Sequence, residues 1–99
     1  MRIAVEVILP VVSRAASELA ARDDDWAPAF AEAVAWLQRQ ETVGFAAADG
    51  AIEVVLEGGR VYRATQMWCP CRAARCWHRA ASILVDRALF FSTYEGGLS

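Results

Sequence analysis

The sequence predicts a small α+β domain with two N-terminal helices, a three-stranded antiparallel β-meander, a metal-binding segment and a C-terminal helix. Three observations predict this fold class. Apolar residues recur at helical spacing up to about residue 40 and again beyond residue 77. Between these regions the pattern changes to short β-rich runs separated by glycine-containing turns. All the cysteines and the only histidine lie between the last β-rich run and the first turn of the last helix.

The bulk composition limits the class of protein. A length of 99 residues fits one compact domain with a modest core. The hydrophobic share of 57% excludes an intrinsically disordered chain and leaves apolar surface for self-association or a partner. No apolar run reaches the roughly 18 residues of a membrane span, and Glu6 within the apolar N-terminus argues against a signal peptide. We therefore expect a cytoplasmic protein without a membrane partner, in which clustered thiols bind metal rather than form disulfides.

The N-terminal region begins with an ambiguous segment. Residues 10–22 predict an amphipathic helix, because apolar and charged side chains separate onto two faces. Residues 2–9 fit two structures: their alternating apolar side chains suit a strand, whereas the interval from Ile3 to Val7 suits a helix. Pro10 is compatible with the first turn of a helix or with a kink in a longer one. We expect a single helix that starts at about residue 3.

A second helix is expected over residues 26–40. The preceding aspartates, Asp23–Asp25, end the first helix and cap the second, and we interpret them as a solvated turn rather than a cation site. Trp26, Phe30 and Leu37 share one apolar face of the second helix. We interpret this face as core or as a dimer seam, not as a cofactor site.

Three β-rich runs follow, over residues 42–48, 51–57 and 60–67. The dipeptides between them, Asp49-Gly50 and Gly58-Gly59, favour two-residue hairpin turns because glycine adopts positive φ. The runs therefore predict an antiparallel meander whose last strand leads directly into the cysteines.

The C-terminal part completes the domain. Helical spacing of apolar residues predicts a helix over about 77–90, and Gly96-Gly97 indicates a frayed tail. We divide the chain into an N-terminal helical segment (1–41), a unit that contains the cysteines (42–92) and a flexible tail (93–99), within one compact domain.

Residues 69–78 read Cys-Pro-Cys-Arg-Ala-Ala-Arg-Cys-Trp-His and contain every candidate soft-metal ligand of the chain. These candidates are Cys69, Cys71, Cys76 and His78. Three thiolates and one imidazole are a standard closed ligand set for structural zinc. The CxC interval requires a turn at the end of the strand. On a helix, residues two apart point apart, so we expect Cys76 just before the C-terminal helix and His78 in its first turn.

Other uses of these residues fit less well. One disulfide would leave an odd thiol, an iron–sulfur cluster normally needs four cysteines, and a Cys–His nucleophile needs no CxC beside it. We therefore expect one structural Zn²⁺, which contributes on the order of 10 kcal/mol to the folding of small zinc modules. Four protein ligands leave no open position, and no carboxylate pair, glycine-rich phosphate loop or serine motif is present. We do not expect an enzyme.

The order of hairpin, CxC, short spacer, CxH and amphipathic helix resembles the SWIM zinc finger. The family's CxC…CxH ligands are matched one for one by Cys69, Cys71, Cys76 and His78. Ala81 falls where the family usually has a small residue, and the resemblance covers about residues 51–90. It implies a ββα finger within 42–92 that binds DNA or other proteins. Two features depart from the family: the four-residue spacer between the second and third cysteines is short, and Trp77 stands where a basic residue is common.

Basic charge gathers around the cysteines. Up to Glu57 there are four arginines against ten acids, a net of −6, and beyond it six arginines against two acids, a net of +4. Five of these arginines lie in a stretch without acids: Arg60, Arg63, Arg72, Arg75 and Arg79. They suit phosphate contact, and Trp68 or Trp77 suits stacking on an unpaired base, so we expect DNA or RNA binding. Alternatively, Arg60 pairs with Glu57 across the Gly58-Gly59 turn, Arg72 and Arg75 hydrogen-bond loop carbonyls or offset the thiolate charge of the site, and Trp77 packs under the last helix.

A second hypothesis is a protein-interaction module. In this interpretation the acidic, alanine-rich N-terminal helices form a homo-oligomer or dock to a partner protein, since alanine-lined helices pack closely. Of the two hypotheses, the sequence favours nucleic acid, and both can hold together.

Overall fold

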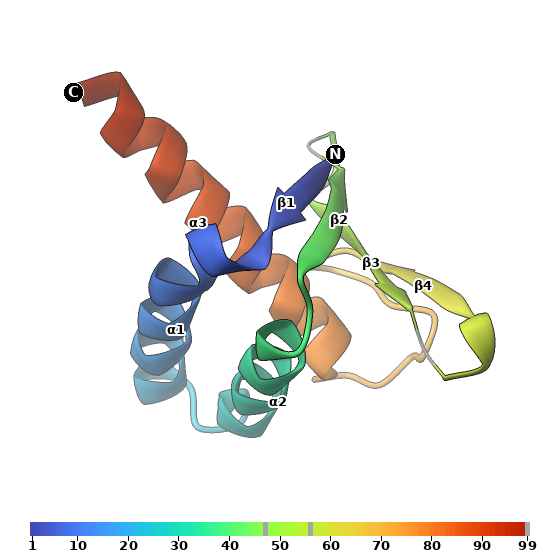
Figure 1. Ribbon diagram of the computed structural model, residues 1–99. Coiled ribbons are helices and arrows are strands. Elements are labelled where there is room, and N and C mark those ends of the chain that lie inside the picture. The colour runs from blue at the N-terminus through green and yellow to red at the C-terminus, as the bar shows by residue number, and fades with distance from the viewer. Residues whose placement is uncertain (47, 56, 99) are drawn as a thin grey trace.

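The computed structural model describes the backbone of residues 1–46, 48–55 and 57–98, and the side chains of these residues up to 89 except that of residue 57. The α+β class is confirmed. In chain order the elements are β1 (Arg2–Ala4), α1 (Val5–Arg22), α2 (Ala27–Gln38), β2 (Thr42–Ala46), β3 (Ala51–Val55), the 3-10 turn η1 (Glu57–Gly59), β4 (Val61–Ala64) and α3 (Trp77–Leu98). Figure 1 shows their arrangement.

The sheet has four antiparallel strands in the order β1-β2-β3-β4, not the three that we expected. The additional strand is β1, in which Ile3 lies opposite Val43 of β2. The expected helix from about residue 3 is therefore wrong at its start, since α1 begins at Val5 and carries Pro10 inside it. Pairing with β2 decides the ambiguous segment, because it gives Ile3 a buried position in the core.

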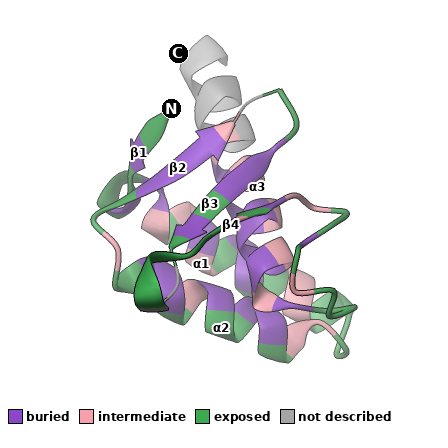
Figure 2. Ribbon diagram, turned by 90° about the vertical axis from the view of Figure 1, so that its right-hand side faces the viewer, coloured by how far each residue is buried: buried purple, intermediate pink, exposed green. Residues whose placement is uncertain are grey.

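The strands bury one face against the helices. Val43 and Phe45 of β2 are buried, and burial alternates along β3 from Ile52 to Val55: Ile52 and Val54 are buried, whereas Glu53 and Val55 on the other face are exposed. Figure 2 shows the buried residues of β2 and β3 above the helices. This period-two alternation is the pattern of a sheet with one face on the core.

Both hairpin connections are longer than the two residues that we expected. Ala46 pairs with Ala51 and Val55 with Val61, so four and five residues connect the strands. The positive φ expected of the glycines is confirmed at Gly50, Gly58 and Gly59. The expected ends of the first two runs include residues 47 and 56, which lie outside the described residues.

Helix α3 runs alongside both the α1–α2 pair and the sheet (Figure 1). Leu84, Val85 and Ala88 on it are fully buried, and no described side chain of residues 77–89 is exposed. Its Ser82 hydroxyl donates a hydrogen bond to the carbonyl of Gly50, which fixes α3 to the β2–β3 turn.

The C-terminal helix extends to Leu98, beyond its expected end near residue 90. The flexible tail expected over 93–99 lies where no side chains are described, and Ser99 is outside the described residues altogether. Within the described ranges no helix is both long and apolar enough to cross a membrane.

Candidate metal centre

The segment from Thr65 to Cys76, which we call the metal loop, carries three of the four predicted ligands from β4 to α3. A turn over Cys69–Arg72 places the first two cysteines: the backbone N–H of Arg72 donates to the carbonyl of Cys69 at 3.0 Å. Pro70 stands at the second position of this turn, where its fixed φ is favourable. Arg72 closes the turn with φ of 62°, in the left-handed region that side chains seldom adopt.

The other two ligands lie at the start of α3, as expected. Helix α3 begins at Trp77, so Cys76 immediately precedes it and His78 is its second residue. The backbone N–H of Arg79 donates to the sulfur of Cys76 at 3.4 Å, which makes this thiol the cap of the helix. The N-terminus of α3 therefore lies against one of the predicted sulfur ligands.

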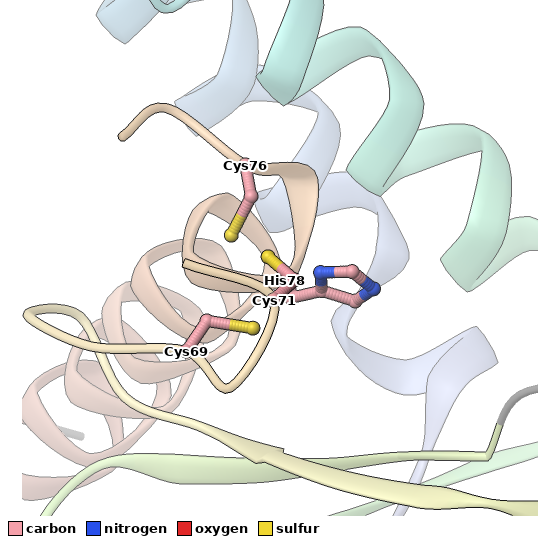
Figure 3. Close-up of side chains that lie close together, drawn as sticks. All are labelled: Cys69, Cys71, Cys76 and His78. Carbon is pink, nitrogen blue, oxygen red and sulfur yellow. The ribbon is translucent and has the colours of Figure 1, made fainter. Parts of the chain in front are cut away.

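The four side chains converge as one group, the Cys₃His cluster: Cys69, Cys71, Cys76 and His78. One ligand atom from each lies within 4.8 Å of the other three. Figure 3 shows the three sulfurs pointing toward one another with the imidazole beside them. Cys69, Cys76 and His78 are buried, Cys71 is half-buried, and all three cysteines are free thiols.

The donor set and its dimensions fit a zinc ion. Tetrahedral zinc with Zn–S bonds of about 2.3 Å holds its ligand atoms roughly 3.5–3.8 Å apart. A contraction of about 1 Å in the widest separation would therefore close the shell. The Nδ1 atom of His78 is buried and has no hydrogen-bond partner among the described residues. Because buried polar atoms are rarely left unpaired, this nitrogen is the observation that most directly indicates a missing ligand.

The protonation states of the metal-free cluster differ from one ligand to the next. Burial raises the pKa of Cys69 to about 12, and the neighbouring thiols add to this effect. Burial also acts on Cys71, but hydrogen bonds from the backbone of Ala73 and from the other two thiols outweigh it and lower the pKa of Cys71. Burial lowers the pKa of His78, against the opposing charge of Glu32, so its imidazole is neutral at pH 7 and available as a ligand.

Aromatic side chains enclose the histidine. The ring of Tyr62 meets that of His78 edge-on with centroids 5.5 Å apart. The ring of Trp77 packs against that of His78, with centroids 4.1 Å apart, and against that of Trp36 of α2, with centroids 5.3 Å apart. Trp77 is therefore packed between α2 and the cluster, whereas the alternative interpretation of this residue placed it under the last helix.

Several of the arginines that we expected to contact nucleic acid have partners within the protein. Arg63 forms an ion pair with Asp49 at 2.7 Å, and Arg75 lies 3.5 Å from Asp25. Arg79 donates from Nε to the carbonyl of Gln66 at 3.0 Å and also to the carbonyl of Ala74. Its guanidinium stacks over the ring of Trp26 at 5.2 Å.

The remaining candidates face solvent. Trp68 is 58% exposed, and Arg72 is exposed without an ion pair in the described part of the chain. Arg60 is exposed at the start of β4, and the side chain of its alternative partner, Glu57, lies outside the described side chains. The structure thus separates Trp68, Arg72 and Arg60 from the members of the predicted set that have internal contacts.

One exposed residue beside these was missed. Met67 is 83% exposed next to Trp68, and both follow Thr65, whose hydroxyl accepts hydrogen bonds from the backbone N–H groups of Met67 and Trp68 at 3.2 and 3.0 Å. The sequence signal for this turn is a threonine directly after the strand, which favours local hydrogen bonds to the backbone. The strand expected over residues 60–67 is therefore too long, since β4 ends at Ala64.

Comparison of the chain with protein-family models, curated proteins and solved structures gave no match. In the structure β3, β4 and α3 do follow one another, but the hairpin belongs to a four-stranded sheet and α3 is covered by two further helices. The resemblance to the SWIM zinc finger therefore rests on the ligand set and its spacing.

Proposed function

We propose that the chain is a small zinc protein in which the Cys₃His cluster holds one structural Zn²⁺ and the surface of the metal loop binds nucleic acid. The observation that carries the zinc assignment is the convergence of four soft ligand atoms within 4.8 Å, together with the unpaired buried Nδ1 of His78. When bound, the ion supplies a cross-link between the strand end and the helix start. With four protein ligands, the site is structural and the protein is not an enzyme.

The exposed part of the metal loop supports nucleic acid as the partner. Arg72 and Arg75 lie on the metal loop between the second and third cysteines, and Asp25, which lies 3.5 Å from Arg75, is itself exposed. An exposed pair at this separation is worth little, so a phosphate can replace the carboxylate. The chain beyond residue 57 has a net charge of +4 while the whole chain carries −2, so the attraction for a polyanion is local to this part of the protein.

Two measurements test the proposal. Native mass spectrometry of the purified protein is expected to show one zinc per chain, and a Cys71→Ser variant less than that. Gel shifts with a mixed-sequence oligonucleotide are expected to weaken as salt rises, with a slope of about −0.7 to −0.9 per phosphate contact. An Arg72→Gln/Arg75→Gln variant should lose most of this slope.

The matched control is Arg14→Gln/Arg22→Gln, which removes the same charge from the exposed side of α1. If both double variants bind oligonucleotide equally, the metal loop is not the binding surface. A folded protein that carries no metal would remove the basis of the whole proposal.

A second candidate function is self-association through α1 and α2. An open groove of about 390 Å³ runs between these helices and is lined mainly by alanine and serine, with Phe30 and Val34 at one side. Val7, also on α1, is 69% exposed. Small residues allow a second helix to approach closely. Sedimentation velocity over a hundredfold range of concentration tests this candidate: a dimer that Ala31→Glu disrupts supports it, and a monomer throughout excludes it.

A further inference from the structure

Within the described side chains, the helices present no basic face to a DNA groove. Among residues 77–89, the part of α3 with described side chains, all are buried or half-buried, so this part of α3 offers no open recognition face for a major groove. The exposed charges of α1 are balanced, with Glu6 and Glu18 against Arg14 and Arg22. Readout of duplex DNA by a helix is therefore incompatible with the described surface.

The surface that remains is the turn formed by residues 65–68, which we call the Trp68 turn. The backbone N–H of Thr65 donates to the carbonyl of Trp68 at 2.8 Å, and the Thr65 hydroxyl accepts hydrogen bonds from the backbone N–H groups of Met67 and Trp68. These hydrogen bonds fix the backbone while Met67 and Trp68 stay 83% and 58% exposed. A backbone that is already fixed loses little entropy on binding, and neighbouring large apolar side chains exposed on it are typical of a recognition surface.

The charges next to the Trp68 turn suit a polyanion. Trp68 directly precedes Cys69, and the Cys69–Arg72 turn brings the backbone of Arg72 back beside Cys69. Arg75 follows on the same loop, and no acid occurs in the sequence between residues 58 and 85; the carboxylate of Asp86 reaches the turn only through a hydrogen bond that it accepts from Gln66 at 2.9 Å. Arg60, also exposed, directly precedes β4, whose four residues span roughly 13 Å at a rise of about 3.3 Å per residue.

We infer that the preferred ligand is single-stranded nucleic acid, with one unpaired base stacked on Trp68 and its neighbouring phosphates held by Arg72 and Arg75. This inference rests on the proposed function and specifies its ligand. An indole stacks on any unpaired base, whereas the bases of a duplex present no free face to it. Trp77 does not take this role because it is packed against Trp36 and His78.

The test is fluorescence anisotropy with labelled strands of equal length: (dT)12, (rU)12, a fully abasic deoxyribose 12-mer and a 12-base-pair duplex. The zinc-loaded wild-type chain is expected to bind (dT)12 or (rU)12 at least tenfold more tightly than the duplex or the abasic strand. Trp68→Ala should weaken (dT)12 binding by about 5- to 150-fold, the range for loss of one stacked base. It should leave abasic-strand binding unchanged, and Trp68→Phe should retain most of the affinity.

The comparison of (dT)12 with (rU)12 decides whether DNA or RNA is bound more tightly. Val7→Ser, which removes an exposed apolar side chain from α1, is the matched control and should change nothing. If no strand binds, the proposed function itself fails. If the strands bind and Arg72→Gln weakens them, but the duplex binds equally well or Trp68→Ala has no effect, the function stands and this inference is overturned.

Discussion

Arg79 shows why residues of one type in one stretch of sequence have different roles. Its hydrogen bonds to the carbonyls of Gln66 and Ala74 join the two ends of the metal loop, and its stacking on Trp26 fixes that loop to the start of α2. Arg72, seven residues earlier, is exposed. The sequence gives both residues the same charge and similar neighbours, so only the tertiary contacts separate a structural arginine from a candidate ligand-binding one.

The first prediction concerns Arg79. Arg79→Met keeps most of the side-chain length but removes the charge and every donor, so two loop carbonyls lose their partner. We expect the free energy of unfolding of the zinc-loaded protein to fall by about 1–3 kcal/mol. Urea denaturation measures this free energy. The control is Arg14→Met on the exposed side of α1, whose free energy of unfolding should stay within about 0.5 kcal/mol of the wild-type value. Equal effects of the two substitutions would contradict the structural role.

The second prediction concerns pH and Asp49. Hydrogen bonds from the Arg63 side chain and from the Ala51 backbone lower the pKa of Asp49 below its ordinary value of 3.8. Because this pKa is lower in the folded state, the ionised carboxylate stabilises the fold above about pH 3.8, and the contribution is lost as the pH falls through the folded-state value. Asp49→Asn should therefore lower the melting temperature at pH 7, by an amount that disappears in stronger acid.

Variants are compared with wild type at each pH, so that acid-induced loss of zinc affects both alike. Asparagine retains an oxygen that accepts the hydrogen bond of Ala51, so the difference reports the ion pair. Arg63→Gln should reproduce it, and the double variant should add nothing further. A melting-temperature difference that persists unchanged below pH 3 would show that the charge of Asp49 is not its cause.

At the level of elements, the spacing of apolar residues was sufficient to predict a helix or a strand wherever that spacing suited only one of the two. The second helix, the β-rich runs and the position of Cys76 before the last helix follow from spacing within a few residues. Strand β1 does not, because residues 2–9 suit two structures and the choice depends on pairing with β2 some forty residues away. The hairpin lengths were wrong for a related reason: glycines with positive φ occur in longer connections as well as in two-residue turns.

The third prediction compares two glycines of one hairpin. Gly50 has φ of +72°, so Gly50→Ala forces alanine into the left-handed region and should cost about 1 kcal/mol. Gly44 lies within β2 without positive φ, and a Cβ there would meet Arg2 Nη1 at 3.1 Å and Glu53 Oε2 at 3.2 Å. Both atoms end flexible side chains that can move aside, so Gly44→Ala should cost less. Urea denaturation of the two variants checks the order, and a larger loss for Gly44→Ala would contradict the φ argument.

At the level of the whole molecule, the candidate site was easier to predict than its surroundings. Its ligands occupy ten consecutive residues, so spacing alone indicates a closed set. The partners of the arginines lie in the acidic N-terminal half or across the sheet, as Asp25–Arg75 and Asp49–Arg63 show. Folding therefore uses part of the basic charge internally, which no count along the sequence can reveal.

The fourth prediction follows from where the core lies. Buried residues of α1, α2, α3 and the sheet form one hydrophobic cluster, of which only Cys69 and Cys76 are predicted metal ligands. We therefore expect chelation to destabilise the protein and release the metal loop without abolishing the helices. At free zinc a thousandfold above its Kd, the metal contributes about 4 kcal/mol to stability. This corresponds to roughly 15–30 °C in melting temperature for a domain of this size.

Circular dichroism with and without a chelator measures the helical signal and the melting temperature, and hydrogen exchange locates the change. Exchange should rise across residues 65–79 and stay low in α1 and in the buried part of α3, because their contacts do not include the metal. Cys71→Ser removes one ligand without removing a fully buried core side chain. This variant should have the melting temperature of the chelated wild type, and the chelator should not change it further. Complete loss of the helical signal on chelation would mean that zinc is required for the entire fold, whereas an unchanged melting temperature would mean that the cluster holds no metal.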